Sequence, residues 1–226
     1  MEAIRAFLRA FTPRRRVVYL IGLCFLAFGI TMNTKSGLGM SPVISVAYII
    51  AELLHIPIGV MTFFYYSFMI LLQLLLLGKA FEHIQWLQIA ASFLISFLIG
   101  LCDKVLPTAA GIPGRAAFLL LAIVLTGIGI ILTVGAEFVP NPPDGAARAI
   151  AIRTGKSLGF SKNLLDFVCI LVTLALGLLF RGQILCVGVG TVVTMLLTGR
   201  VVALLQKPVL ALAKCGLASS ETSAII

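Results

Sequence analysis

The sequence predicts an all-α integral membrane protein with six transmembrane helices and two short re-entrant or interfacial helices. Three observations lead to this fold class. Of the 226 residues, 61% are hydrophobic and 11% are charged, whereas about a quarter of a soluble domain is charged. Six apolar runs have close to the ~20 residues that a spanning helix needs. Two polar stretches rich in Gly and Pro, SGLGMSP at 36–42 and PNPPDG at 140–145, adjoin the starts of two shorter helical segments.

The composition also restricts the class of function and the partners. So apolar a chain cannot cover itself with polar surface, which excludes a soluble enzyme, a secreted disulfide scaffold and a disordered protein. The net charge of +9 comes from basic residues that lie mainly between the apolar runs. This distribution is typical of the positive-inside rule and of contact with anionic lipid head groups. We therefore expect the lipid bilayer as a partner and no nucleic acid.

The first apolar run, 17–34, is expected to remain as a helix. It is long for a signal peptide, and no small-x-small cleavage site follows it. Residues 1–16 are interpreted as a cytoplasmic amphipathic segment and residues 206–226 as a cytoplasmic tail. The other five spans are expected at 58–78, 85–105, 116–136, 163–180 and 183–205.

Two further segments, 42–54 and 143–155, have a helical pattern but are short. A helix of this length reaches less than about 20 Å at ~1.5 Å per residue, against roughly 30 Å of hydrocarbon. The prolines at the start of each segment suit the first turn of a helix, where the missing N–H costs nothing. We therefore predict that both segments are helices that do not span.

The two halves of the chain match at a constant offset, which predicts an internal duplication. The first repeat is 17–105 and the second is 116–205. Pairs that lie 100 residues apart include Gly29 and Gly129, Pro42 and Pro142, Ala47 and Ala147, and Gly59 and Gly159. After a slip of one residue, Gly78 aligns with Gly177 and Gly100 with Gly199.

The number of spans in each half predicts a 3+3 inverted repeat. Three spans are an odd number, so the second half begins on the opposite side of the membrane from the first. If the short segments also spanned, the repeats would be parallel, and Arg148 and Arg153 would enter a membrane helix at about 3 kcal/mol each. The inverted arrangement, with both termini cytoplasmic, instead gathers most basic residues on the inner side.

At these residues the chain resembles the bacterial YczE/YitT-type membrane proteins, an uncharacterised family of small polytopic proteins. The resemblance rests on SGLGMSP at 36–42, on PPDG at 142–145, on GKSLG at 155–159 and on the helix that carries Asp166. It implies a multi-pass protein of the bacterial cytoplasmic (inner) membrane. It implies no established activity.

Asp144 and Arg148 form the most polar feature at a candidate membrane depth. Asp144 is interpreted either as the N-cap of the second short helix or as a buried carboxylate that binds a cation or a proton. Arg148 follows at i+4 and either neutralises Asp144 or meets an anionic solute beside a positive helix end. Ile44 stands at the first-half position of Asp144, so the acid belongs to one half alone.

The other candidate solute-binding residues are Asp166, Asn141, Ser41, Glu52 and Tyr48. Asp166 begins the fifth span with Lys162 at i−4, which indicates either an interfacial ion pair or an intramembrane acid on a transport path. Asn141 and Ser41 precede the prolines of the two short helices. Tyr48 and Glu52 share one face of the first short helix, as either its polar side or a pathway lining.

The chain shows no signature of catalysis, of a cofactor or of a metal site. No Ser-His-Asp arrangement, Walker loop or HExxH motif is present, and the five cysteines and two histidines lack metal-ligand spacing. Half-helices in inverted repeats are typical of secondary transporters, so we predict a small-solute permease with its site at the interface of the two repeats. The alternative is a non-transporting accessory or scaffold protein that assists a membrane-associated enzyme.

Overall fold

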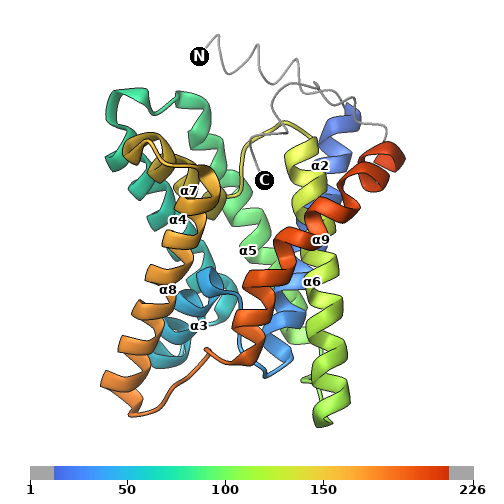
Figure 1. The fold of residues 1–226 in the computed structure, drawn as a ribbon, viewed down its shortest axis with the longest axis vertical. Coiled ribbons are helices and arrows are strands. Elements are labelled where there is room, and N and C mark those ends of the chain that lie inside the picture. The colour runs from blue at the N-terminus through green and yellow to red at the C-terminus, as the bar shows by residue number, and fades with distance from the viewer. Residues whose placement is uncertain (1–12, 214–226) are drawn as a thin grey trace.

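In a computed structural model of the chain, which describes residues 13–213, every regular element is a helix (Figure 1). The predicted fold class is confirmed, because six helices are long and apolar enough to cross a membrane. These six are α2 (Pro13–Lys35), α4 (Ile58–Leu77), α5 (Leu87–Val105), α6 (Gly111–Gly135), α8 (Leu158–Arg181) and α9 (Val189–Ala213). The two short helices are α3 (Pro42–Leu54) and α7 (Pro142–Thr154), and the 3₁₀ turns η1 (Gly78–Ala80) and η2 (His83–Trp86) link α4 to α5.

The helix bounds agree with the predicted ones except near charged residues and in one apolar loop. Helix α8 begins five residues before the predicted 163, since Lys162 continues the helix instead of ending it. Residues 182–188 are apolar but form a loop, because Gly182 and Cys186 both adopt positive φ angles, 62° and 67°. The predicted segment 1–16 lies mostly outside the described residues, as does 214–226 of the predicted tail; residues 206–213 continue α9.

The helices pack as two groups of four (Figure 1). Helices α2, α5, α6 and α9 form one group, and α3, α4, α7 and α8 form the other, in which both short helices pack on α4 and on α8. The α4–α5 interface is the main helix contact between the groups, whereas α8 and α9 scarcely touch although they follow each other in the chain. Helix α7 lies toward the end of the bundle where α2 begins and α9 ends, and α3 lies toward the opposite end.

The first and fourth spans, α2 and α6, cross closely and in opposite directions. A Cβ added to Gly29 would lie 2.7 Å from Thr126 N, and one added to Gly129 would lie 2.6 Å from Leu26 N. The two contacts are equivalent at an offset of 100 residues, because Gly29 corresponds to Gly129 and Leu26 to Thr126. Only glycine allows two helix backbones to approach so closely, so the pair fixes the crossing of the two halves.

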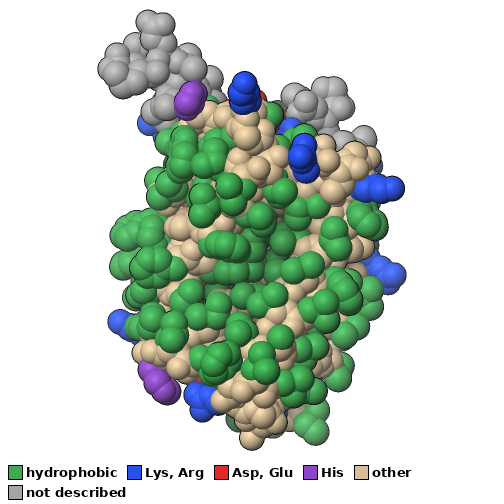
Figure 2. All heavy atoms as spheres, turned by 90° about the vertical axis from the view of Figure 1, so that its left-hand side faces the viewer, with side chains coloured by type: hydrophobic (Ala, Val, Ile, Leu, Met, Phe, Trp, Pro, Cys, Tyr) green, Lys and Arg blue, Asp and Glu red, His purple; other side chains and the backbone are tan. Residues whose placement is uncertain are grey.

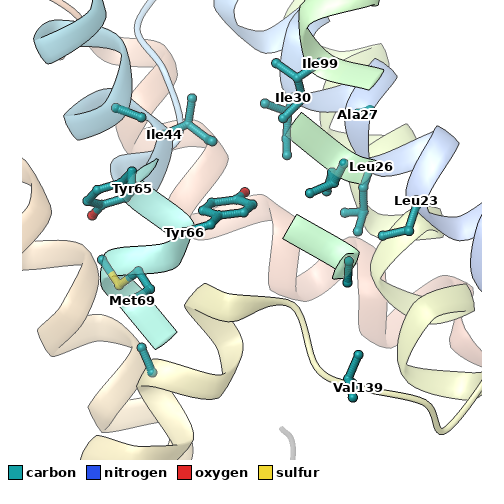
Figure 3. Close-up of a cluster of buried hydrophobic side chains, with 14 of the residues drawn as sticks. Leu23, Leu26, Ala27, Ile30, Ile44, Tyr65, Tyr66, Met69, Ile99 and Val139 are labelled. Atoms are coloured by element: carbon teal, nitrogen blue, oxygen red, sulfur yellow. The ribbon is translucent and has the colours of Figure 1, made fainter. Parts of the chain in front are cut away.

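Side-chain distribution gives the bundle the surface of a membrane protein. Figure 2 shows hydrophobic side chains over the middle of one face, with most of the visible Lys, Arg and His side chains toward its two ends. Phenylalanines of α4 and α8 are largely exposed, including Phe64, Phe68 and Phe167, as expected for side chains that face lipid. Leu23, Ala27, Tyr66 and Ile99 belong to the buried core between the groups (Figure 3).

Candidate functional site

Helices α4 and α8 carry their polar residues at matching positions, which we call the polar stripe. It comprises Thr62, Tyr66 and Gln73 on α4 and Lys162, Asp166 and Thr173 on α8. Spacings of four and seven residues place each set on one face of its helix. All except Lys162 are at most 8% exposed. A hydrogen-bonding contact of 3.3 Å between Tyr65 Oη and Cys169 Sγ joins the two helices midway along the stripe.

Both short helices turn their N-termini into the bundle, next to the stripe. Helix α3 runs parallel to α8, since Ser45 Oγ lies 2.8 Å from Thr173 Oγ1 and Arg181 Nη2 donates to Glu52 O over 3.4 Å. Thr173 lies about 12 Å along α8 from its end at Arg181, at ~1.5 Å per residue. The N-terminus of α3 therefore reaches that depth, while its C-terminus stays at the end of the bundle.

At the other end, the N-terminus of α7 meets the charged part of the stripe. Lys162 Nζ donates to Asp144 Oδ1 over 2.9 Å. The Asn141 side chain is in hydrogen-bonding contact with Tyr66, whose ring extends from α4 on the side away from Tyr65 (Figure 3). Acidic groups in the first turn of a helix are stabilised by its dipole, so this placement of Asp144 is electrostatically favourable.

Of the alternatives for Asp144 and Arg148, the N-cap role of Asp144 and its pairing with Arg148 are wrong. Helix α7 begins at Pro142, so Asn141 is the N-cap and Asp144 lies in the first turn. From there the Asp144 carboxylate points to α8 and pairs with Lys162, whereas Arg148 is exposed. The displacement follows from Pro142 and Pro143, which both fit inside the first turn of a helix.

Asp166 is the most deeply buried charged residue of the described part of the chain. It is 8% exposed and lies about 12 Å along α8 from its start at Leu158, at ~1.5 Å per residue. The prediction placed Lys162 beside it as an ion-pair partner, and Lys162 does lie one turn away. The ammonium group of Lys162, however, contacts Asp144.

The remaining predicted residues belong to α3 and its N-cap. Ser41 is the N-cap of α3, and its backbone N–H donates to Asn33 Oδ1 over 3.0 Å. Tyr48 and Glu52 line a cavity of about 420 Å³ with His55 and the ion pair of Lys35 and Asp103 (2.8 Å). Burial raises the pKa of the Tyr48 phenol, and the Glu52 carboxylate raises it further.

The seven predicted residues lie in two places. Asn141, Asp144 and Asp166 lie together at the α7 end, with Arg148 exposed on α7 nearby. Ser41, Tyr48 and Glu52 lie with α3. The two clusters are linked through helices, since α3 and α7 both pack on α4 and on α8.

A buried pair of glutamines is the main feature that sequence reasoning missed. The amides of Gln73 and Gln88 donate to each other over 3.0 Å in both directions, and Gln73 Nε2 also donates to Pro142 O over 3.1 Å. Both side chains are at most 1% exposed, and together they tie α4, α5 and α7. The available signal was a glutamine inside each of the two apolar runs, 58–78 and 85–105, because polar side chains in spans need partners.

The stripe offers proton donors and acceptors but no metal site. In residues 13–213, no three His, Cys, Asp or Glu side chains converge in a way that could hold a metal ion. The side chains of the stripe can donate and accept hydrogen bonds, and the charged groups beside it come from α7 and α8.

Comparisons with known proteins place the chain in a group without an assigned activity. A model described as a family of unknown function, DUF6198, matches residues 13–207. The uncharacterized membrane protein YczE of Bacillus subtilis (strain 168) is 26% identical over 190 residues, which cover 82% of each chain. No solved structure matches the chain.

Proposed function

The chain belongs to DUF6198, a family of unknown function, and we propose that it is a small-solute permease or secondary transporter, not an enzyme. Its solute site would lie along the polar stripe, between two repeats of opposite orientation. The observation that carries the proposal is the pair of half-helices, α3 and α7, whose N-termini turn into the bundle from opposite ends. Transporters bind solutes and ions at such helix ends, near the middle of the membrane.

What supports the inverted repeat is the agreement of local geometry at an offset of 100 residues. Helices α2 and α6 end at Lys35 and Gly135, and α3 and α7 have the same length. The residues after α3 and α7, His55 and Gly155, both adopt the left-handed conformation, with φ angles of 55° and 66°. The reciprocal glycine contacts of α2 and α6 add a tertiary match between the halves.

One equivalent interface differs between the halves, and we interpret the difference as a state of the transport cycle. A Cβ on Gly59 would lie 2.6 Å from Ser96 O and 2.8 Å from Gly100 Cα, so α4 and α5 are in backbone contact. The corresponding glycines of α8 and α9, Gly159 and Gly199, would meet nothing within 4 Å. Rocking of one repeat against the other is the usual way to alternate access, and here it would close α8 on α9 as α4 separates from α5.

A disulfide between Gly159→Cys and Gly199→Cys tests that exchange. In a chain whose native cysteines are replaced by serine, we expect the pair to cross-link in membranes upon mild oxidation. The matched control is Gly159→Cys with Leu204→Cys, because Leu204 is 78% exposed on α9 and should not approach α8. Cross-linking of the control pair but not of the test pair would contradict the exchange.

The experiment that tests transport itself uses Cys169, a native residue of α8 that is 3% exposed beside the stripe. The other four cysteines are replaced by serine, and an impermeant methanethiosulfonate reagent is added to right-side-out and to inverted vesicles. A transporter predicts modification from both sides. The matched control carries Ile95→Cys and no other cysteine, because Ile95 is fully buried on α5 outside the stripe, and it should stay unmodified. Modification of Cys169 from neither side, with full modification after denaturation, contradicts transport.

We place the chain in the bacterial cytoplasmic membrane with the α7 end and both termini inside. The support is the count of basic residues, which are fewer at the α3 end: Lys35, Lys104, Arg115 and Arg181. The α7 end carries Arg14, Arg15, Arg16, Lys79, Arg148, Arg153, Lys156, Lys162 and Lys207. Thr108→Cys and Ser157→Cys, both at exposed positions, should label from the outside and from the inside respectively. Labelling of both from one side contradicts the inverted topology.

The second candidate function, a scaffold for a membrane-associated enzyme, is favoured by the exposure of α9. The most apolar window of α9 is 17% buried, the lowest share among the six spans, so a partner protein could cover it as well as lipid. A scaffold needs no route through the polar stripe. The Cys169 experiment therefore separates the two functions.

A further inference from the structure

The inner end of the polar stripe holds two acids and one base. Asp144 comes from the first turn of α7, and Lys162 and Asp166 come from α8. The side chains of Asp144 and Lys162 are 32% and 49% exposed and form an ion pair, while Asp166 is 8% exposed. One ammonium group can neutralise one carboxylate at a time, so the cluster carries an acid in excess.

Asp166 is the acid left over. Within residues 13–213 its carboxyl group makes no hydrogen bond or ion pair. The titratable or charged groups that face it are Asp144 from α7, Tyr65 from α4, and Lys162 and Cys169 from its own helix. Helix α3 packs on α8 farther along the chain, between Thr173 and Arg181. An ionised carboxylate in this position would be costly, because intramembrane acids need a partner or a cavity.

The partners of Asp166 limit what it can bind. The one neighbouring hydroxyl, that of Tyr65, is in hydrogen-bonding contact with Cys169 Sγ. A metal cation takes several oxygen ligands, which the described groups around Asp166 do not provide. A proton needs only one carboxylate oxygen, so it is the ligand that fits.

Lys162 can reach both acids. It lies one turn from Asp166 on α8, a spacing at which helical side chains are neighbours, and its ammonium group is 2.9 Å from Asp144 Oδ1. The flexible four-carbon stem of lysine allows its ammonium group to exchange between partners. When Asp166 is neutral, the Lys162 ammonium group stays paired with Asp144. When Asp166 is ionised, its carboxylate competes with that of Asp144 for the ammonium group.

We infer that Asp166 is a proton-binding site and that Lys162 reports its occupancy to α7 by moving between Asp144 and Asp166. A proton taken from water onto an Asp166 carboxylate oxygen leaves Lys162 free to bind Asp144. Release of that proton to water attracts Lys162 to Asp166 and breaks the ion pair that holds α7 on α8. The inference rests on the proposed transport function, for which it names the proton as the coupling ion.

The binding site is tested by infrared difference spectroscopy of the purified chain in lipid nanodiscs across a pH series. We expect a protonated-carboxyl C=O band that disappears as the pH rises and that is absent in Asp166→Asn. Asp144→Asn frees Lys162 for Asp166, so the pH midpoint of the band should fall by about one unit or more. Lys162→Met removes the competing cation, so the midpoint should rise. The matched control, Asp103→Asn at the outer ion pair, should leave the band unchanged.

Three outcomes would overturn the site. The first is a band that persists in Asp166→Asn, and the second is a midpoint that does not respond to Asp144→Asn and Lys162→Met. The third is loss of the band at constant pH when sodium chloride replaces choline chloride, which would assign a sodium ion instead. None of these measurements uses a solute, so failure of the transport proposal and failure of the proton site can be told apart.

The movement of α7 is tested by spin labels at Arg153→Cys on α7 and Asn163→Cys on α8, both exposed positions. The distance distribution should change as the pH passes the midpoint of the infrared band. Asp166→Asn should keep the low-pH distribution at every pH. A distribution that is independent of pH in the wild-type sequence would overturn the coupling, even if the carboxyl band titrates.

Discussion

The two halves of the chain have the same order of helices but differ in chemistry. Helices α3 and α7 begin at equivalent prolines, have the same length and end at left-handed residues. Yet Ile44 stands where Asp144 does, Thr62 where Lys162 does, and Tyr66 where Asp166 does. Backbone geometry is fixed by small residues and caps, which leaves the inward-facing side chains free to diverge. The charges at the polar stripe, Asp144, Lys162 and Asp166, are therefore confined to the second half.

The halves also differ in how firmly they are attached. In the first half, α4 is held to α5 by close glycine contact and by the buried glutamine pair. In the second half, α8 has neither kind of contact with α9 in the described part of the chain. The charged cluster thus belongs to the half with fewer constraints.

The largest loss of stability is expected from substitutions that disrupt the crossing of α2 and α6, to which both halves contribute. Gly29→Val and Gly129→Val should each reduce stability by about 3 kcal/mol or more, since each new Cβ meets backbone that cannot withdraw. The measurement is thermal unfolding in detergent.

The matched control for the crossing is Gly199→Val on α9, where an added Cβ meets nothing within 4 Å. It should leave the unfolding temperature nearly unchanged. Equal losses for Gly29→Val and Gly129→Val would sharpen the view of a two-fold crossing. A loss for only one of the two would contradict it.

The next effect concerns the attachment that only the first half has. Gln73→Leu leaves the Gln88 amide without its partner, and we expect a loss of about 2–3 kcal/mol. At the equivalent position Thr173→Val removes one hydroxyl, while Ser45 Oγ keeps its bond to Pro42 O, so the expected loss is about 1 kcal/mol. Chemical unfolding in mixed micelles compares them.

A double variant checks the interpretation of the glutamine pair. Gln73→Leu with Gln88→Leu removes both amides and leaves neither amide without its partner. The loss of stability in the double variant should therefore be smaller than the sum of the two single losses. Simple addition of the two losses would mean that the glutamines act independently, against the reciprocal hydrogen bonds.

Most of the fold could be predicted from the sequence because it depends on local properties. Apolar length identifies the six spans, and Pro42 and Pro142 mark the starts of the short helices within one residue. The errors arise where tertiary structure overrides local pattern. Lys162 lies inside a helix because Asp144 of another helix pairs with it, and the apolar residues 182–188 form a loop, in which the Cys186 carbonyl accepts from Met40 N.

The site was predictable in its residue types but not in its pairs. Acids and amides in apolar segments indicate function whatever their partners, so Asp144, Asp166 and Asn141 could be selected. Which cation meets Asp144 depends on the packing of α7 on α8, which places Lys162 against it. The glutamine pair likewise becomes visible only when α4 lies on α5.

A smaller change in stability is expected from substitutions at the C-terminal ends of α3 and α7, and it should differ between the two ends. Gly155 occupies the left-handed region with φ 66°, where a Cβ costs about 1 kcal/mol, so Gly155→Ala should lose that amount. His55→Gly at the equivalent position, φ 55°, should change stability by less, since relief of strain is offset by the freedom of glycine in the unfolded chain. The measurement is thermal unfolding of both variants. A loss for His55→Gly as large as that for Gly155→Ala would show that the ends are not equivalent.

The smallest expected effect on stability removes the charge that distinguishes the halves. Asp144→Asn keeps the size of the side chain and loses only the charge-assisted bond to Lys162. The Asp144 side chain is about one-third exposed and the Lys162 side chain about one-half. Ion pairs with this exposure contribute about 0.5 kcal/mol, so the unfolding temperature should hardly change. Arg148→Gln, one turn away and exposed, is the matched control and should have no effect on stability. A large loss for Asp144→Asn would mean that the charge holds the fold together. A negligible loss, with altered proton binding at Asp166, would mean that the second half keeps these charges for function, because the first half forms a short helix of the same length with Ile44 at the matching position.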